Sequence, residues 1–179
     1  IIKGVDEYPE LLRLSAANPG NDHRLGSQEA PPAIISVFLG EQLEDVIDQL
    51  CSTGEATHSK SGGTLKTGVA TLPDLDKDAT DRNRTSPFAF TGNKFEFRML
   101  GSAASVANPN VVLNTAVAEA LAQFYTELEG TKPEDMEQAV HELIKRAIRK
   151  HKKVIFNGNG YTDEWVAEAE KRGLYNLPS

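Results

Sequence analysis

Two aromatic runs around a polar turn constrain the fold of this chain more than any other feature. Residues 88–90 (FAF) and 95–100 (FEFRML) flank the turn-forming stretch 91–94 (TGNK). Turn residues between two runs rich in strand-forming side chains predict an antiparallel hairpin. Because successive side chains of a strand point to opposite faces, Glu96 and Arg98 share one face. The other face of the second strand consists of Phe95, Phe97 and Met99.

The region after this hairpin predicts two long helices. Asn108 and Pro109 begin the first, whose apolar side chains recur at three- and four-residue spacing as far as Gly130. Thr131 and Glu134 form a capping-box pattern at the start of the second helix. The expected apolar face of that helix consists of Met136, Val140, Leu143, Ile144 and Ile148.

Two further helices complete the expected set. One runs from about residue 33 to residue 50, and a short one near the C-terminus is capped by Thr162 and ends at Gly173. Helices around an antiparallel hairpin or small sheet indicate an α+β fold. We expect residues 1–107 to form one unit and residues 108–179 to form a helical region that packs on it.

Composition excludes several protein classes. Apolar residues make up 39% and charged residues 25% of the 179 residues, which argues against disorder or collagen. The lone Cys51 indicates a reducing, cytoplasmic setting. No apolar run is long enough to span a membrane, and no signal-peptide pattern begins the chain. Since the first residue is Ile1 rather than Met, we expect a piece of a longer protein.

Charge is divided unevenly along the chain. Residues 1–144 carry a net charge of −11, whereas residues 145–179 carry +4. Most of the positive charge belongs to Lys145, Arg146, Arg149, Lys150, Lys152 and Lys153. Such a stripe suits phosphate or nucleic acid, or it complements the negative end of a helix dipole. We favour the helix-end interpretation and expect no nucleic-acid partner.

Three segments carry side chains suited to chemistry. Glu96 can ligate a hard cation such as Mg²⁺ and Arg98 can clamp an anion, although a solvated strand face with an ion pair explains the same pattern. Residues 81–86 (DRNRTS) offer two arginines to a transferring phosphoryl group. They close the long polar stretch 52–86, which shows no sustained periodicity. The irregular segment 18–32 contains His23, Arg24 and Glu29.

Several familiar motifs are missing from the sequence. No cysteine or histidine pairs have zinc-site spacing. A glycine-rich phosphate loop with Lys and Ser or Thr does not occur, and neither does a G-x-S-x-G elbow. A zinc site and these two classes of active site are therefore not expected.

Taken in order, the three segments resemble the C-terminal half of the catalytic domain of glutamine synthetase, specifically its long type III form. The similar stretches are residues 21–32 (NDHRLGSQEAPP), 81–88 (DRNRTSPF) and 92–98 (GNKFEFR). The tail 155–161 (IFNGNGY) is also similar to type III, so the resemblance covers essentially the whole chain. It implies that residues 1–107 belong to a catalytic domain whose sheet continues in strands outside this chain.

This resemblance implies a glutamate–ammonia ligase. The family uses ATP to phosphorylate the side-chain carboxylate of L-glutamate, and ammonia then displaces phosphate from the γ-glutamyl phosphate. Mg²⁺ or Mn²⁺ is required. Members assemble into large rings, so the resemblance implies a homo-oligomer, with stacked rings in the full-length parent. We expect no membrane partner.

The resemblance also implies a role for each matched residue. Arg24 resembles the arginine that binds the α-carboxylate of glutamate. Glu29 resembles the flap glutamate that shields the acyl-phosphate from water and accepts a proton after ammonia attacks. Arg84 resembles the arginine that neutralises the transferring phosphoryl group, and Arg84 and Lys94 are matched to nucleotide binding.

Two residues of the predicted hairpin complete the implied site. Glu96 resembles a ligand of the metal ion that bridges nucleotide and phosphoryl oxygens. Arg98 resembles the arginine that holds substrate and phosphate. The polar face of the second strand thereby acquires a function.

The chain departs from the shorter glutamine synthetases at several positions. His23 stands where they have lysine, and one residue fewer separates Arg24 from Glu29. Ala89 stands where they have a second arginine, and Lys94 keeps only one charge of a basic pair.

Three functional hypotheses follow. The first is a fragment of the ligase, which we expect to be inactive alone because most metal ligands of the family precede this region and one carboxylate cannot hold Mg²⁺. The second is a phosphate- or nucleotide-binding module that uses Arg82, Arg84 and the basic helix end without ligase chemistry. The third assigns residues 108–179 to oligomer packing and is compatible with the first.

Overall fold

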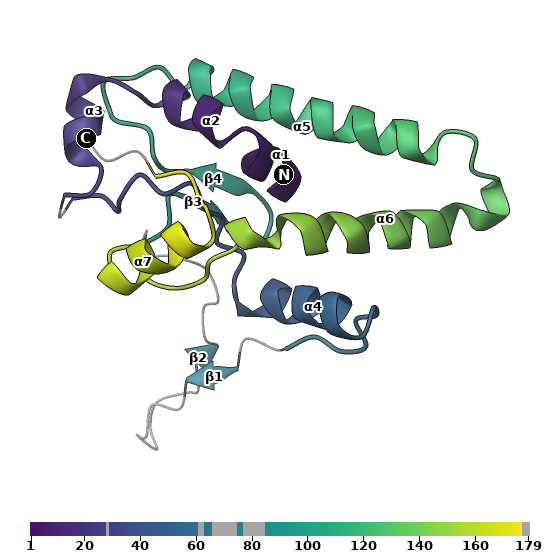
Figure 1. The fold of residues 1–179 in the computed structure, drawn as a ribbon. Helices are drawn as coiled ribbons and strands as arrows, with labels where there is room; N and C mark the ends of the chain where they lie inside the picture. The colour runs from purple at the N-terminus through teal and green to yellow at the C-terminus, as the bar shows by residue number, and fades with distance from the viewer. Residues whose placement is uncertain (28, 61–62, 66–74, 77–84, 177–179) are drawn as a thin grey trace.

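Helices surround a small set of strands in the computed structural model (Figure 1). The structure describes residues 1–27, 29–60, 63–65, 75–76 and 85–176. The predicted α+β class is confirmed, because antiparallel strand pairs lie among the helices. Within the described residues, none of the helices combines the length and the apolar character needed to cross a membrane.

The described elements follow one another along the chain as helices, then short strands, then helices. They are α1 (Ile2–Glu7), α2 (Pro9–Ser15), α3 (Pro19–Arg24), α4 (Glu41–Ser52), β1 (Thr64–Leu65), β2 (Leu75–Asp76), β3 (Phe88–Phe90), β4 (Phe95–Phe97), α5 (Ala107–Leu128), the 3₁₀ turn η1 (Pro133–Asp135), α6 (Met136–His151), the 3₁₀ turn η2 (Lys152–Val154) and α7 (Asp163–Lys171).

The predicted hairpin is confirmed. β3 and β4 pair antiparallel, with Phe88 opposite Phe97 and Phe90 opposite Phe95. The Phe88 ring packs against the Phe95 and Phe97 rings, with centroids 5.6 and 5.7 Å away. Phe88 is buried, as is Met99 just beyond β4. The aromatic side chains therefore anchor the hairpin to the core.

Residues 34–40 form an extended segment with isolated β-bridges at Ile34, Val37 and Phe38, so the helix expected from about residue 33 begins only at Glu41. The β-branched side chains of Ile34, Ile35 and Val37 are buried along this stretch. A short, mostly apolar run of this kind fits a strand buried on both faces as well as a helix. Gly40, with a φ of +86°, ends the run and precedes α4.

This extended segment lies between the hairpin and the region just after α6. The Phe38 N–H donates to the Phe88 carbonyl over 2.9 Å, and the Val37 N–H donates to the Val154 carbonyl over 2.8 Å. The side-chain oxygen of Asn157 accepts the backbone N–H groups of Leu39 and Gly40, each over 2.8 Å. Three distant parts of the chain are thereby joined side by side at the centre of the fold.

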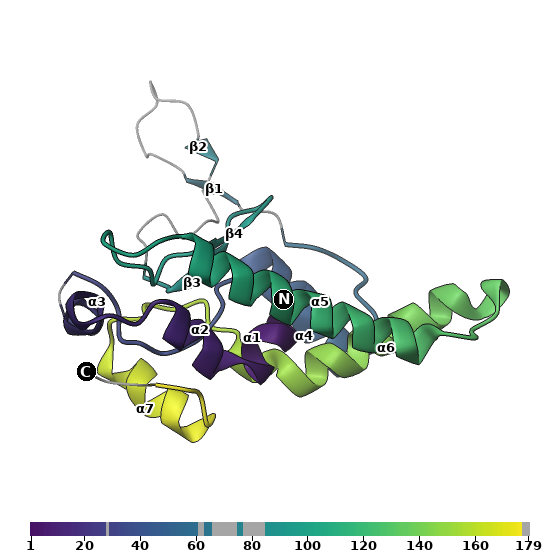
Figure 2. The same cartoon turned by 90° about the horizontal axis from the view of Figure 1, so that it is seen from above.

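Helices α5 and α6 form an antiparallel pair that extends away from the strands (Figure 1), and α1 and α2 pack along α5 (Figure 2). The first helix is confirmed: Pro109 lies in its first turn, and Gly130, with a φ of +84°, follows its end. The capping box predicted for the second is wrong. Pro133 opens a 3₁₀ turn there, and no side chain caps either that turn or α6.

The terminal helix α7 is also confirmed. Thr162 is its N-cap, and the Thr162 hydroxyl accepts the Trp165 backbone N–H over 3.3 Å. Gly173, with a φ of +64°, lies just beyond the end. The Trp165 ring stacks on Phe156 with centroids 3.6 Å apart, so α7 is held against the segment that follows η2.

Candidate functional site

A cavity of about 580 Å³ lies between the hairpin and the loop that follows α3. Tyr161, from the segment before α7, lines its far side. Several residues singled out in the sequence line this one cavity: Arg24, Glu29, Glu96 and Arg98.

Arg24 is the last residue of α3 and is held by two hydrogen bonds. Its Nε donates to the side-chain oxygen of Asn21 over 3.0 Å, and its Nη2 donates to the Met99 carbonyl over 3.1 Å. The N-cap of this helix is Asn18, whose side chain accepts the Asn21 backbone N–H over 2.9 Å. A guanidinium fixed in this way loses little freedom when it binds an anion.

Asn21 is a positioning residue that sequence reasoning missed. It is buried, and its amide nitrogen donates to the Ala16 and Met99 carbonyls over 2.5 and 3.0 Å. Its oxygen is then directed at Arg24. The spacing of three residues puts Asn21 and Arg24 on neighbouring positions of one helix face, which is the signal that the sequence contained.

Glu96 and Arg98 lie on the same face of the strand, as the alternation predicted. Arg98 Nε and Nη2 both donate to Glu96 Oε2, over 3.2 and 3.1 Å. Lys94 Nζ lies 3.2 Å from the other carboxylate oxygen, Oε1. The hydrogen bond from Lys94, followed by the one from Arg98, lowers the pKa of Glu96 below its ordinary value. The carboxylate therefore stays ionised, as a metal ligand must be.

Glu29 belongs to a loop that folds back on the end of α3. Gly26, with a φ of +86°, makes the turn, and its N–H donates to the Ala30 carbonyl over 3.2 Å. The Glu29 side chain is exposed while it lines the cavity. The Tyr161 hydroxyl donates to the Glu29 carbonyl over 3.4 Å, which connects the loop to the segment before α7.

The remaining two predicted site residues are Lys94 and Arg84. Lys94 is exposed beside Glu96 and is not among the residues that line the cavity. Arg84 lies outside the described residues, as does Arg82. Two neighbouring residues, Thr85 and Ser86, are described, and Ser86 lines the cavity.

The described residues offer a metal ion only part of a coordination shell. No group of three or more His, Cys, Asp or Glu side chains in the described part of the chain is placed to hold a metal. Mg²⁺ prefers six oxygen ligands. Glu96 fits as one of these, so the other ligands would have to be water, substrate or other protein groups.

Comparison with known proteins gives consistent matches. The family model "Glutamine synthetase C-terminal domain" matches residues 139–179. The chain is 49% identical over 180 residues to a "Type-3 glutamine synthetase" of Dictyostelium discoideum, a match that covers 100% of this chain and 24% of that protein. It is 48% identical over 178 residues to a glutamine synthetase of Butyrivibrio fibrisolvens, with coverage of 99% and 25%.

A third relative is a glutamine synthetase of Bacteroides fragilis (strain YCH46), which is 42% identical over 183 residues, with coverage of 99% and 25%. The chain thus spans about a quarter of the length of these relatives.

Proposed function

Because this chain belongs to the glutamine synthetase family, we propose that it forms part of an enzyme that joins ammonia to the side-chain carboxylate of L-glutamate at the expense of ATP. The observation that carries the proposal is the convergence of Arg24, Glu29, Glu96 and Arg98 on one cavity. These residues come from two segments far apart in the sequence. An anion-binding module has no need of the two carboxylates in this set.

Arg24 binds the α-carboxylate of glutamate in this proposal. Its guanidinium is already oriented by Asn21 and by the Met99 carbonyl, and donors left over from these bonds can reach a carboxylate. Such fixed placement of a substrate lowers the barrier by positioning the reacting carboxylate. Asn21 acts only through Arg24.

Glu96 and Arg98 stabilise the transferring phosphoryl group in this proposal. Mg²⁺ or Mn²⁺, when bound, neutralises the negative charge shared by ATP and the transferring phosphoryl group. Glu96 contributes one ionised ligand to that ion, and Arg98 offers donors to phosphoryl oxygens once its contacts with Glu96 are exchanged. Arg84 and Lys94 complete the proposed contacts to the nucleotide.

Glu29 shields the acyl-phosphate and takes up the proton that ammonia loses. Its side chain is exposed on a loop at the cavity, so a small movement of the loop can bring the carboxylate over the reacting atoms. Water must be kept out at this stage because an acyl-phosphate hydrolyses readily. The contact from Tyr161 to the Glu29 backbone holds the loop nearby.

The full-length enzyme that contains this chain tests the proposal. We expect Glu96→Ala to lower the rate of glutamate- and ammonia-dependent phosphate release from ATP by about 100-fold or more, the scale found when one electrostatic group is removed from an active site. Glu137→Ala, an exposed site on α6, is the matched control and should leave the rate unchanged. Equal activity of the two variants would refute the proposed role of Glu96.

The 179-residue chain alone is expected to be inactive, since Glu96 is the one metal ligand proposed among its described residues and a single carboxylate cannot hold Mg²⁺. Homo-oligomeric assembly in stacked rings and a cytoplasmic setting belong to the same proposal. Phosphate release by the isolated chain in the presence of ATP, glutamate and ammonia would contradict the expectation of inactivity.

A further inference from the structure

A second cavity, of about 400 Å³, lies between α4, the end of α6 and α7. It shares no lining residue with the cavity described above. Positive side chains dominate its lining: Arg149, Lys150, Lys152, Lys153 and Arg172. Two carboxylates of α4, those of Glu44 and Asp48, line the same cavity.

Compensation of the α6 dipole accounts for Arg149 and Lys150 in the last turn of α6, but not for the presence of Arg172 in the same cavity. Lys145 and Arg146, one turn earlier on α6, are paired with Glu142 and Glu127. Arg172 belongs to the end of a different helix and still reaches the cavity. Cations from two helix ends therefore line one cavity. Their charges add, so the electrostatic potential in the cavity is more positive than any one of them would make it.

Two of these cations are fixed in place. Arg172 Nε donates to Glu168 over 2.8 Å, and its Nη1 donates to the Ile155 carbonyl over 2.9 Å. The same guanidinium lies over the Trp165 ring, 5.4 Å from its centroid. Arg149 Nη2 donates to the Cys51 carbonyl over 2.9 Å. An anion that binds here meets guanidinium groups that are already ordered, which reduces the entropy lost on binding.

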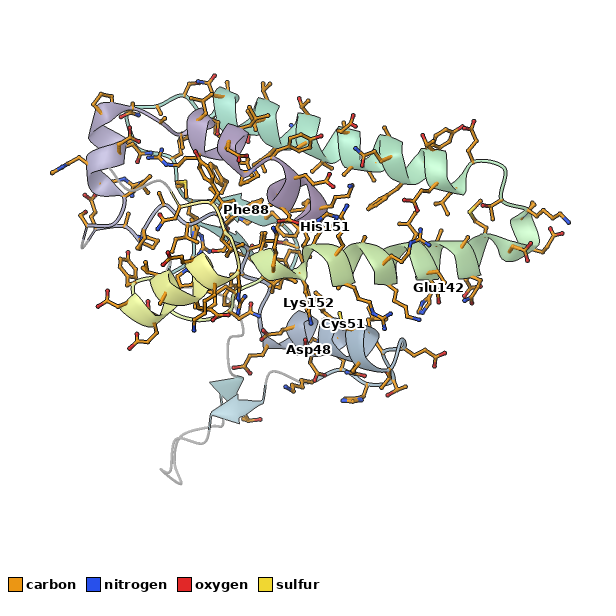
Figure 3. The ribbon with its side chains drawn as sticks, in the orientation of Figure 1. Asp48, Cys51, Phe88, Glu142, His151 and Lys152 are labelled. Carbon is orange, nitrogen blue, oxygen red and sulfur yellow. The ribbon has the colours of Figure 1, made fainter. Side chains whose placement is uncertain are left out.

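Lys152 is the cation most available to a ligand. Its side chain is exposed, and the side-chain amino group makes no hydrogen bond or ion pair with other residues in the described ranges. Lys153, by contrast, is 3.2 Å from Asp6. Figure 3 shows Lys152 on the side of α6 that faces Asp48 and Cys51 of α4. Lys152 and Asp48 thus present opposite charges to the same space.

We propose that this second cavity binds a small phosphate ester whose other end carries hydroxyl groups. The phosphate accepts hydrogen bonds from Lys152, Arg149 and Arg172. The hydroxyl groups donate to Glu44 and Asp48, as ribose hydroxyls do to carboxylates in nucleotide sites. The volume is within the range of small-molecule sites. This proposal is independent of the ligase activity.

Calorimetric titration of the full-length protein that contains this chain, at low ionic strength, tests the phosphate contact, with ribose 5-phosphate and inorganic phosphate as probes. We expect saturable binding of ribose 5-phosphate that Lys152→Gln weakens more than about fivefold, the effect of losing one charge-assisted hydrogen bond. Lys132→Gln removes the same charge at an exposed site between α5 and α6 and should leave the affinity for ribose 5-phosphate unchanged. Absence of binding, or an equal loss of affinity for ribose 5-phosphate in both variants, overturns the proposal.

The carboxylates are tested by comparing the two probes. The intact chain should bind ribose 5-phosphate more tightly than inorganic phosphate, because only the sugar phosphate reaches Asp48. Asp48→Asn should reduce the difference in affinity between ribose 5-phosphate and inorganic phosphate. The variant should bind inorganic phosphate at least as tightly as the intact chain does, because a negative charge has been removed from the cavity. Equal affinity of the intact chain for the two probes overturns the assignment to a hydroxyl-bearing ester.

Discussion

Glu96 has a cation on each side of its carboxylate, and this sets how its charge depends on pH. Lys94 and, after it, Arg98 lower its pKa in the folded protein. A carboxyl group whose pKa is lowered by folding stabilises the protein above its unfolded pKa, and the effect is lost as the pH falls through the folded pKa. The polar face of β4 therefore keeps its ion pairs at neutral pH and loses them in acid.

Lys94→Gln is expected to raise the pKa of Glu96 towards its ordinary value, because it removes the first of the two hydrogen bonds that favour the ionised form. Titration of the side-chain carboxyl carbon by NMR measures this directly. A Lys132→Gln protein provides the control for a lost positive charge. A Glu96 midpoint unchanged by Lys94→Gln would show that the pair at 3.2 Å is not formed in solution.

Single residues differ in how far the sequence reveals them. The alternation of the strand placed Glu96 and Arg98 on one face, because a period of two follows from strand geometry. It did not place Arg24 beside them, and only the family resemblance suggested that grouping. Asn21 was missed because its partner at Met99 is 78 residues away, and nothing in the local pattern indicates which backbone a helix will meet.

At the scale of elements, the segment before α7 is fitted closely to the backbone that leads into β3. The Gly160 N–H donates to the Thr85 carbonyl over 3.1 Å. A Cβ atom at position 160 would lie 2.1 Å from that same oxygen, far inside van der Waals contact. The two backbone segments can approach this closely only because residue 160 is glycine.

Gly160→Ala is expected to lower the free energy of unfolding by about 1–3 kcal/mol, the usual cost of overpacking. Gly20→Ala is the matched control: residue 20 is helical, and an added Cβ would meet only the Asn18 side chain, at 3.6 Å. That variant should be unchanged or slightly more stable. Urea unfolding of both proteins measures the difference, and equal stabilities would mean that the 160–85 contact can relax without loss.

The sequence predicted α4, α5, α6 and α7 better than it predicted their first residues. It did not predict α1, α2 or α3, and α3 lies within residues 18–32, which we expected to be irregular. α5 and α7 carry clear signals, namely an apolar period ending at Gly130 and a Thr162 cap. The start of α4 was misplaced because a buried strand and a buried helix segment have the same apolar composition. The first turn of α6 was misread because Pro133 suits a 3₁₀ turn as well as an α-helix.

At the scale of the whole molecule, a buried polar contact holds α1 against the end of α6. His151, labelled in Figure 3, is 2% exposed, and its Nδ1 lies 2.7 Å from Asp6 Oδ2. An ionised carboxylate only accepts hydrogen bonds, so the ring nitrogen is the donor. Lys153 lies 3.2 Å from the other oxygen of Asp6. Asp6 thus joins the start of the described chain to η2.

Asp6→Ala is expected to destabilise the fold by about 1–3 kcal/mol, because it leaves the buried His151 donor without an acceptor. Glu10→Ala, at an exposed site on α2, is the control and should have little effect. Chemical denaturation gives the free energies, and hydrogen exchange should show α1 opening more readily in the first variant. Loss of stability no greater than in the control would contradict a structural role for this pair.

The extended segment around Val37 also affects how the chain reaches its fold. One of its neighbours, β3, lies well downstream, and the Asn157 side chain that binds the Gly40 backbone is 117 residues away. Contacts at such sequence separation slow folding, because a long loop must close before they form. During synthesis this apolar strand leaves the ribosome with both edges unpaired. The unpaired backbone of this segment stays accessible to chaperones until the residues beyond α6 emerge and form their hydrogen bonds with it.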